Sequence, residues 1–500
     1  MRRMNRSLAM AAVFFMATSF STSSQTVLTI ERALEIAETN SPELRTSLYN
    51  LERSELLLLA QKASLKSQFS LSLNPISYTQ TRSFDQRVSQ WYTNKIFNTS
   101  GTFRIEQPII WTNATLSLIN TFGWQNNEST TAGGTTTNKA FSNTLRLQLS
   151  QPIFTYNSQK MELEELEYDY ENMYISYALQ RLNLERSITS QFYAVYTAQD
   201  NLQISRDELA NAEQNYQIIK DKVDADLLAR EELFQAELNL ASARSTVNNR
   251  IVSLENAKDN LKKILGMPLE EEISTIAQID SVKTVKIDVD KAVENALNTR
   301  LELRQREIQT DLLEFQLIRT KAQNEFSGNI NLSLGVMGDN EEFGNIYKNP
   351  TNSPSVEVSF NVPIFDWGAN KKRVKAQEKS IQLNQLEAEE EIKDIQIEIR
   401  QTCRSLDNLV AEIEIARQSV QNAQHTYELN AEKYRNGTIT GMDMSQFQNQ
   451  LSSQKMSYAQ SLINYKIELL NLKILTLYNF ETNTAITPIN SEAIKTHTRK

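Results

Sequence analysis

Two stretches of the chain, each about 65 residues long, contain neither Gly nor Pro; they run from Gln159 to Lys222 and from Asn370 to Asn436. The whole sequence has only 12 Gly and 9 Pro in 500 residues, so loops and turns must be few. A helix of ~65 residues is ~95 Å long at ~1.5 Å per residue. Such helices cannot stand alone, and their apolar positions predict broad lateral packing. Returning helices are expected over 231–265 and 442–477.

The chain consists of two copies of one unit. Residues 29–45 resemble residues 288–304 at an offset of 259. The segment 152–154, Pro-Ile-Phe, recurs as 363–365 at an offset of 211, and this second offset persists to the end of the repeat. Each copy is therefore expected to run helix, strands, long helix, tip, long helix. The first copy carries 48 extra residues (259 − 211), all in its β region.

Four segments alternate apolar and polar residues with the period of a β-strand. They lie at 69–73 and 145–149 in the first copy and at 330–336 and 356–362 in the second. Runs of about ten residues with one apolar and one polar face suit a lipid-facing barrel with a wet interior. A soluble sandwich with one buried face shows the same alternation, but it has no obvious use for such long helical extensions.

The extra segment of the first copy, around 81–140, includes a stretch from Gly101 to Trp124 that looks like another strand pair. Phe103 and Ile105 alternate there with Arg104 and Glu106. Three roles stay open for this segment: longer outer loops, an extension of the β layer, or a partial plug of the mouth.

The N-terminus reads as a secretory signal over residues 1–24. Arg2, Arg3 and Arg6 precede an apolar run at 8–20, and small residues follow. The alternative is a membrane anchor, but thirteen apolar-leaning residues are too few to span a bilayer comfortably. No Cys lies nearby, which argues against a lipoprotein anchor. No later apolar run is long enough for a transmembrane helix, so a membrane-spanning mature chain needs a barrel.

Composition argues against several function classes. The net charge of −9 gives no footprint for nucleic acid. Cys403 is the single cysteine, and His425 and His497 are the only histidines. Histidine-based catalysis, thiolate metal sites and disulfides thus have almost no raw material, and neither an enzyme nor a cofactor is expected. The acidic run 389–391 reads as a solvated helix face.

Four strands per chain cannot close a membrane-spanning barrel, because the smallest such barrels need about eight. Copies of the chain must therefore share one barrel, and three copies would give twelve strands. With these features, the chain resembles the TolC family of outer-membrane efflux proteins over nearly all of its mature length. The resemblance rests on "ALEIAETNSPELR" (33–45), "VPIFDWGANKKRVKAQ" (362–377) and "YELNAEKYRNGTITGMDM" (427–444).

The resemblance implies a mainly α fold with a β-barrel: a homotrimer whose 12-stranded barrel lies in outer-membrane lipid and continues into a periplasmic α-helical tunnel. It implies a passive exit duct that works with a periplasmic adaptor protein and an inner-membrane pump. The expected segments are 1–24, signal; 25–67, N-terminal helices; 68–155, β region with insertion; 156–284, helical hairpin; 285–328, N-terminal helices; 329–365, barrel strands; 366–480, helical hairpin; 481–500, polar tail.

The resemblance also assigns candidate gate residues. An acidic residue just after the second tip lines the closed aperture in this family, and Asp443 holds that position. Three copies would form a ring of carboxylates that favours cations. The compared example has a second Asp three residues on, whereas this chain has Gln446, which predicts a weaker ring. Tyr434 and Glu232 fall where neighbouring helices are linked in the closed state; a solvated Glu232 is the alternative.

Tips and junctions complete the expected sites. The tips should meet the adaptor, although ordinary tip packing is the alternative; the candidates are Leu227, Leu228, Gly437, Ile439 and Thr440. The strand-to-helix junctions are expected at Pro152, Phe154, Pro363, Phe365 and Gly368. A proline cannot donate to a β ladder and suits a strand end, and a glycine eases the change of direction.

Three rival readings remain. A non-transporting periplasmic or surface coiled coil would explain the helices but not the duplicated strand–helix–tip units. A secreted enzyme would need a constellation of reactive side chains on loops, and loops are nearly absent. Within the duct reading, drug efflux and type I protein secretion are not separated by the sequence.

Overall fold

The computed structural model describes residues 26–86, 89–131, 133–277, 285–436 and 438–486. The expected signal at 1–24 and most of the expected tail lie outside these residues. The chain forms two compact units. Unit 1 contains Met1–Glu43, Leu184–Thr284 and Leu406–Leu469, and unit 2 contains Leu44–Asn183, Val285–Ser405 and Leu470–Lys500.

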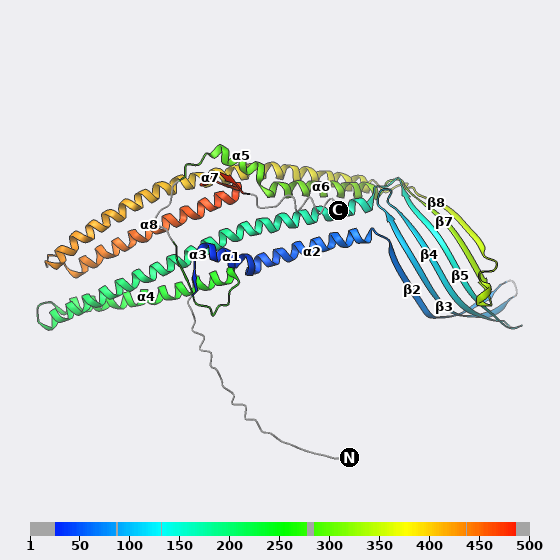
Figure 1. Cartoon of the computed structure of the whole chain (residues 1–500), viewed down its shortest axis with the longest axis horizontal. Coiled ribbons are helices and arrows are strands. Elements are labelled where there is room, and N and C mark those ends of the chain that lie inside the picture. The colour runs from blue at the N-terminus through cyan, green and yellow to red at the C-terminus, as the bar shows by residue number, and fades with distance from the viewer. Residues whose placement is uncertain (1–25, 87–88, 132, 278–284, 437, 487–500) are drawn as a thin grey trace, which may run out of the picture. The chain divides into compact units, whose positions relative to one another are not determined.

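The long helical hairpins are confirmed (Figure 1). Helix α3 (Ser158–Asp224) is followed by α4 (Arg230–Leu265), and α7 (Ala369–Arg435) is followed by α8 (Gly441–Thr476). Helices α3 and α7 both have 67 residues, since no Gly or Pro interrupts them. The second pair begins and ends 211 residues after the first at every bound (369 − 158, 435 − 224, 441 − 230, 476 − 265). The structure thus confirms the duplication.

Two shorter helices precede the strands of each copy. They are α1 (Ile30–Asn40) and α2 (Pro42–Ser64) in the first copy and α5 (Val289–Thr299) and α6 (Leu301–Ala322) in the second. The side chain of Thr29 caps α1 and that of Asp288 caps α5, each by accepting backbone N–H groups. In the described part of the chain, no helix combines the length and apolar character needed to cross a membrane.

Unit 2 contains a six-stranded antiparallel sheet in the order β2-β3-β4-β5-β7-β8 (Figure 1). The strands are β2 (Gln68–Asp85), β3 (Gln90–Ile109), β4 (Ala114–Thr131), β5 (Gly134–Ile153), β7 (Ser327–Asn340) and β8 (Thr351–Asn361). A 3₁₀ turn, η1 (Phe343–Asn345), lies between the last two. A small hairpin of β9 (Tyr478–Asn479) and β10 (Thr484–Ala485) follows α8.

The expectation of four strands per chain was wrong, because the sheet has six. Of the three roles left open for the extra segment, the structure shows an extension of the β layer. In β3, Thr99 and Gly101 occupy positions on the otherwise apolar face, between Phe97 and Phe103. This dilutes the alternation, and pairing with long neighbours on both sides supplies what the local pattern lacks.

The sheet has one apolar and one polar face. Residues paired directly across an antiparallel ladder point to the same side. One such row runs through all six strands: Phe69, Ile105, Leu118, Leu147, Leu334 and Pro354. The next row on the other face holds Ser70, Arg104, Ile119, Arg146, Gly335 and Ser353. The apolar face is exposed; Phe69 and Leu334 keep 67% and 66% of their surface.

The helices of unit 2 pack against one another near the end of the sheet where strands connect to helices (Figure 1). Leu51 and Leu58 of α2 form a buried cluster with Tyr170 of α3. Helix α6 links α3 and α7 through charge pairs: Arg304 Nε donates to Glu171 at 2.7 Å, and Arg306 Nε donates to Glu391 at 2.9 Å. These pairs connect α6 to both long helices.

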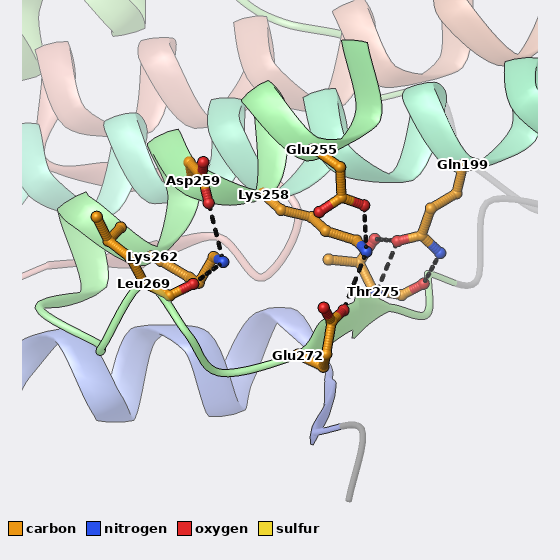
Figure 2. Close-up of polar contacts among 8 residues, drawn as sticks. All are labelled: Gln199, Glu255, Lys258, Asp259, Lys262, Leu269, Glu272 and Thr275. Atoms are coloured by element: carbon orange, nitrogen blue, oxygen red, sulfur yellow. Dashed lines mark hydrogen bonds and ion pairs between the residues drawn. The ribbon is translucent and has the colours of Figure 1, made fainter. Parts of the chain in front are cut away.

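In unit 1, the short strand β1 (Thr26–Leu28) pairs in parallel with β6 (Ile273–Thr275). Figure 2 shows how β6 is held against two helices. Gln199 of α3 accepts the backbone N–H of Thr275 at 2.9 Å and donates to its carbonyl at 3.2 Å. The buried Lys258 of α4 donates to Glu255 at 2.9 Å and to Glu272 at 3.4 Å. Its charge is therefore paired with one carboxylate of its own helix and with one that directly precedes β6.

Gly266 ends α4 with a left-handed backbone, φ 69°, and its N–H bonds to the carbonyls of Lys262 and Lys263. A Cβ atom at this position would lie 2.2 Å from the carbonyl oxygen of Asn40, at the end of α1. The site requires glycine twice, for the backbone angle and for the close approach.

We expect Gly266→Ala to destabilise the protein by roughly 1–3 kcal/mol, because the new methyl group adds a clash to left-handed strain. The measurement is thermal unfolding of the purified protein, followed by the helical circular-dichroism signal. Gly344→Ala is the matched control, since no atom lies within 4 Å of its added Cβ. Equal melting temperatures for both variants would contradict this account of the α4 terminus.

Candidate functional site

The tips of the two hairpins use the same backbone turn. In the first, Asp226 has φ 54° and the N–H of Leu227 donates to the carbonyl of Lys222 at 2.8 Å. In the second, the N–H of Thr438 donates to the carbonyl of Lys433 at 2.9 Å, again 211 residues later (438 − 227). This bond is the signature of a Schellman ending, which reverses the chain in few residues. The expected tip residue Gly437 lies outside the described residues.

The apolar tip residues predicted from the sequence differ in exposure. Leu227 keeps 73% of its surface and Leu228 keeps 39%. Ile439 is half-buried and Thr440 is exposed. In the single chain, the first tip therefore presents the larger apolar surface.

Asp443 takes part in a capping box at the start of α8. Its Oδ2 accepts the backbone N–H of Thr440 at 3.0 Å and the hydroxyl of Thr440 at 2.7 Å. In return, Thr440 Oγ1 accepts the N–H of Asp443 at 3.1 Å. These hydrogen bonds, the hydroxyl's first, hold the pKa of Asp443 below its ordinary value. The carboxylate is thus ionised and fixed in place at neutral pH.

Tyr434 and Glu232, the predicted gate pair, lie in the last turn of α7 and the first turn of α4. Tyr434 is half-buried and Glu232 is exposed. Within the described part of a single chain, no hydrogen bond joins the two side chains. A link between them stays a prediction.

Tyr434 lines a cleft of about 720 Å³ between the two hairpins, inside unit 1. Each of the four helices contributes polar side chains to it; examples are Glu208, Asn211 and Asn215 of α3, Asn239 of α4, and Asn449 of α8. Burial raises the pKa of Glu208, and Arg250 partly offsets that effect. A polar cleft between packed helices needs little free energy to admit water, because water can form hydrogen bonds with its polar groups.

Gly441 of α8 lies close to Asn215 of α3 in this cleft. A Cβ atom at Gly441 would lie 2.2 Å from Oδ1 of Asn215. The equivalent position of the first copy is Arg230 (441 − 211). Sequence analysis missed this contact. The sequence signal for this contact is Gly441 at the start of a helix, where the other repeat has the large side chain of Arg230.

The strand-to-helix junctions differ between the copies. Pro152 is still inside β5, opposite Asn329, and Phe154 follows with φ 57°. In the second copy, Pro363 and Phe365 lie in the connection between β8 and α7, and Gly368 has φ 75°.

Asp366 starts α7 in that connection. It accepts the N–H groups of Gly368 and Asn370, each at 2.8 Å, and these bonds hold its pKa below its ordinary value. The sequence-based prediction named the glycine but not this cap.

Among the described residues, no group of three or more His, Cys, Asp or Glu side chains could hold a metal ion. The features of the tip region are two hairpins with hydrogen-bonded turns, a polar cleft and one tight contact between helices.

Comparison with known proteins adds a family. The family model described as "Outer membrane efflux protein" matches residues 114–267 and 292–476. The chain is 22% identical over 288 residues to the "Probable outer membrane lipoprotein SilC" of Salmonella typhimurium, a match that covers 56% of this chain and 60% of the relative's length. It is also 22% identical over 339 residues to "Nodulation protein T" of Rhizobium leguminosarum bv. trifolii, covering 65% of this chain and 70% of the relative.

A solved structure has the same fold. The CmeC outer membrane channel of Campylobacter jejuni superposes with a TM-score of 0.70 at 15% sequence identity, and the match covers 94% of this chain and 89% of that one.

The capping box predicts a pH dependence at the second tip. Because the pKa of Asp443 is lowered on folding, its contribution to stability is present above its ordinary pKa of 3.8 and is lost as the pH falls through the lower folded value. Amide hydrogen exchange of residues 440–446 should accelerate below pH ~3.8, relative to mid-helix peptides of α8.

Asp443→Asn is the control for this effect, because an amide accepts hydrogen bonds but does not titrate in this range. If the variant shows the same pH dependence as the unmodified protein, Asp443 is not its source.

Proposed function

The chain belongs to the outer membrane efflux protein family, and on that basis we propose that it is the exit duct of an efflux or type I secretion system of several proteins. Proteins of this family are channel proteins, so the chain is a transport protein and not an enzyme. It is located in the bacterial outer membrane, with its helical tunnel in the periplasm. We propose that the exported cargo consists of small toxic compounds or of proteins.

The observation that carries the proposal is the exposed apolar face of the six-stranded sheet. A row of apolar side chains crosses every strand, while Arg104, Glu106, Arg146 and Glu357 are on the opposite face. An apolar face toward lipid and a polar face toward a water-filled lumen fit a barrel wall. A soluble protein of one chain would have to cover this face.

Aromatic side chains support the same orientation, because membrane barrels have aromatic girdles at both interfaces. Near the helical end of the sheet, Phe326 stacks on Phe360, and Phe365 packs against Trp367. At the opposite end lie the pairs Phe84–Trp91, Phe97–Trp124 and Phe122–Phe141.

The assembly we propose is a homotrimer in which three copies share one barrel and one helical tunnel. The expected barrel of twelve strands assumed four strands in each of three chains. Because the sheet of one chain has six strands, that number no longer follows. At the periplasmic end we propose contact with an adaptor protein, itself bound to an inner-membrane pump. Leu227, Leu228, Gly437, Ile439 and Thr440 are the proposed contact residues.

The proposed gate lies at the same end. Three copies of Asp443 form a ring of carboxylates at the aperture, and Tyr434 and Glu232 of neighbouring hairpins hold it closed. Opening separates the α7–α8 hairpin from the α3–α4 hairpin in the manner of an iris. The polar cleft and the Gly441–Asn215 contact between these hairpins support this motion. The alternative, a non-transporting coiled-coil structural protein, leaves the apolar sheet face without a role.

Conductance across a planar bilayer tests the function, with protein extracted in detergent and sized beforehand. We expect a trimer-sized particle with small, cation-selective currents, because a nearly closed aperture with a carboxylate ring limits the flow. Asp443→Asn should lower the cation selectivity while its amide oxygen can still accept the N–H of Thr440. A soluble particle without channel activity would overturn the duct; unchanged selectivity would remove Asp443 from the aperture.

Gly441→Leu tests the gate. The larger side chain cannot fit against Asn215, so the α7–α8 hairpin should move outward and single-channel conductance should rise several-fold. Leucine favours helix more than glycine, so lost helix does not explain such a gain. Ser453→Leu, at an exposed position of α8, is the control and should leave the conductance unchanged. Equal conductance in both variants argues against the proposed opening motion.

A further inference from the structure

The sheet has two open edges, β2 and β8, and the extra strand pair lies between β2 and β5. We propose that β8 of each chain pairs with β2 of the next copy and that β3 and β4 are part of the wall. Three copies then enclose the lumen with eighteen strands instead of twelve. This inference rests on the proposed trimeric duct and specifies how its membrane part is built.

The edges need a partner. An edge strand leaves a row of backbone N–H and C=O groups unpaired, and hydrocarbon offers them no hydrogen bonds. Both edges carry exposed apolar residues: Leu71 keeps 63% of its surface on β2 and Val356 keeps 74% on β8. Six is an even number of antiparallel strands, so β2 and β8 run in opposite directions. A second copy can therefore continue the antiparallel order at either edge.

The pairing register carries the stagger that a closed barrel requires. Phe69, the second residue of β2, is level with Pro354, which lies seven residues before the end of β8 at Asn361. If the ends meet, with Asn361 beside Gln68 of the next copy, Pro354 lies beside Pro75. Each chain thus advances the register by six residues (75 − 69).

That stagger predicts the strand tilt. Six residues at ~3.3 Å, divided by six strand spacings of ~4.8 Å, give a tilt of about 35°. Membrane barrels have tilts of about 35–45°. With the strand ends paired in this way, the register within one chain is compatible with a closed wall.

An even stagger also keeps the faces continuous. Phe360 falls beside Phe69 of the next copy and Val358 beside Leu71, apolar beside apolar. Ser359 falls beside Ser70 on the polar face. An odd stagger would turn the apolar side chains of one copy into the wet lumen.

The extra hairpin fits the wall as a unit. Its strands pair along nearly their whole length with β2 on one side and β5 on the other. The 48 residues in excess in the first repeat equal the span 86–133 (133 − 86 + 1), which is one strand out and one strand back. Because two strands are added, the edge strands still run in opposite directions and the apolar side chains stay on one face of the sheet. Eighteen strands at this tilt give a backbone diameter of ~34 Å, against ~22 Å for twelve.

Cysteine pairs test the strand neighbours in the full-length, membrane-inserted protein, in a Cys403→Ser background. Ser70→Cys with Ser359→Cys should link copies into a covalent trimer on a non-reducing gel. Leu71→Cys with Ser359→Cys is the matched control and should not link, because these side chains point to opposite faces.

A second set separates eighteen strands from twelve. Ser72, Thr102, Thr121 and Thr144 are level on β2, β3, β4 and β5. Ser72→Cys with Thr102→Cys should form an internal disulfide, whereas Ser72→Cys with Thr144→Cys should not. The latter pair is three strand spacings apart, ~14 Å, beyond the ~7 Å limit for a disulfide.

The outcomes are distinct. A disulfide between positions 72 and 144, with none between 72 and 102, places the extra hairpin outside the wall and overturns the eighteen-strand barrel. A sized trimer without the link between positions 70 and 359 overturns the edge pairing but leaves the duct. A particle that is monomeric and needs no detergent overturns the proposed function itself.

Discussion

Backbone N–H and C=O groups have no water to bond with in a bilayer, and this constraint decides how the six-stranded sheet is used. Its apolar face is exposed and both its edges are open. For one chain alone, water disfavours the exposed apolar face, and lipid leaves the backbone groups of the two edges without hydrogen bonds. In the proposed assembly, the six-residue stagger from Phe69 to Pro75 resolves this conflict, because it brings matching faces and opposite strand directions to the two edges.

Duplication explains why the helical part is so regular. The two hairpins share all four bounds at one offset and the same hydrogen bond at each tip. The copies differ where function needs asymmetry. One difference is the strand pair added to the first copy, which widens the wall in the proposed barrel. The other is Gly441 in place of Arg230, which lets α8 approach Asn215 of α3 closely.

The sequence predicted the helices nearly to the residue, because a run without Gly or Pro has no other regular structure available at that length. The expected run from Gln159 to Lys222 lies within α3, which extends it by one residue at the start and two at the end. A strand pair was predicted in the extra segment, but its role in the β layer was left open, since Thr99 and Gly101 interrupt the alternation that marks a strand. The Gly441–Asn215 contact joins helices far apart in sequence and has no local pattern. For Asp443, position and charge were predicted, but its capping bonds follow from local geometry alone.

The most direct test of the account is an electron cryo-microscopy reconstruction of the detergent-extracted particle. We predict threefold symmetry, a membrane wall of eighteen strands, and helical hairpins that leave from one end of that wall. A threefold particle with a twelve-stranded wall would contradict the central claim. In that case β3 and β4 would lie outside the barrel wall, and the sheet seen in the single chain would have to rearrange on assembly.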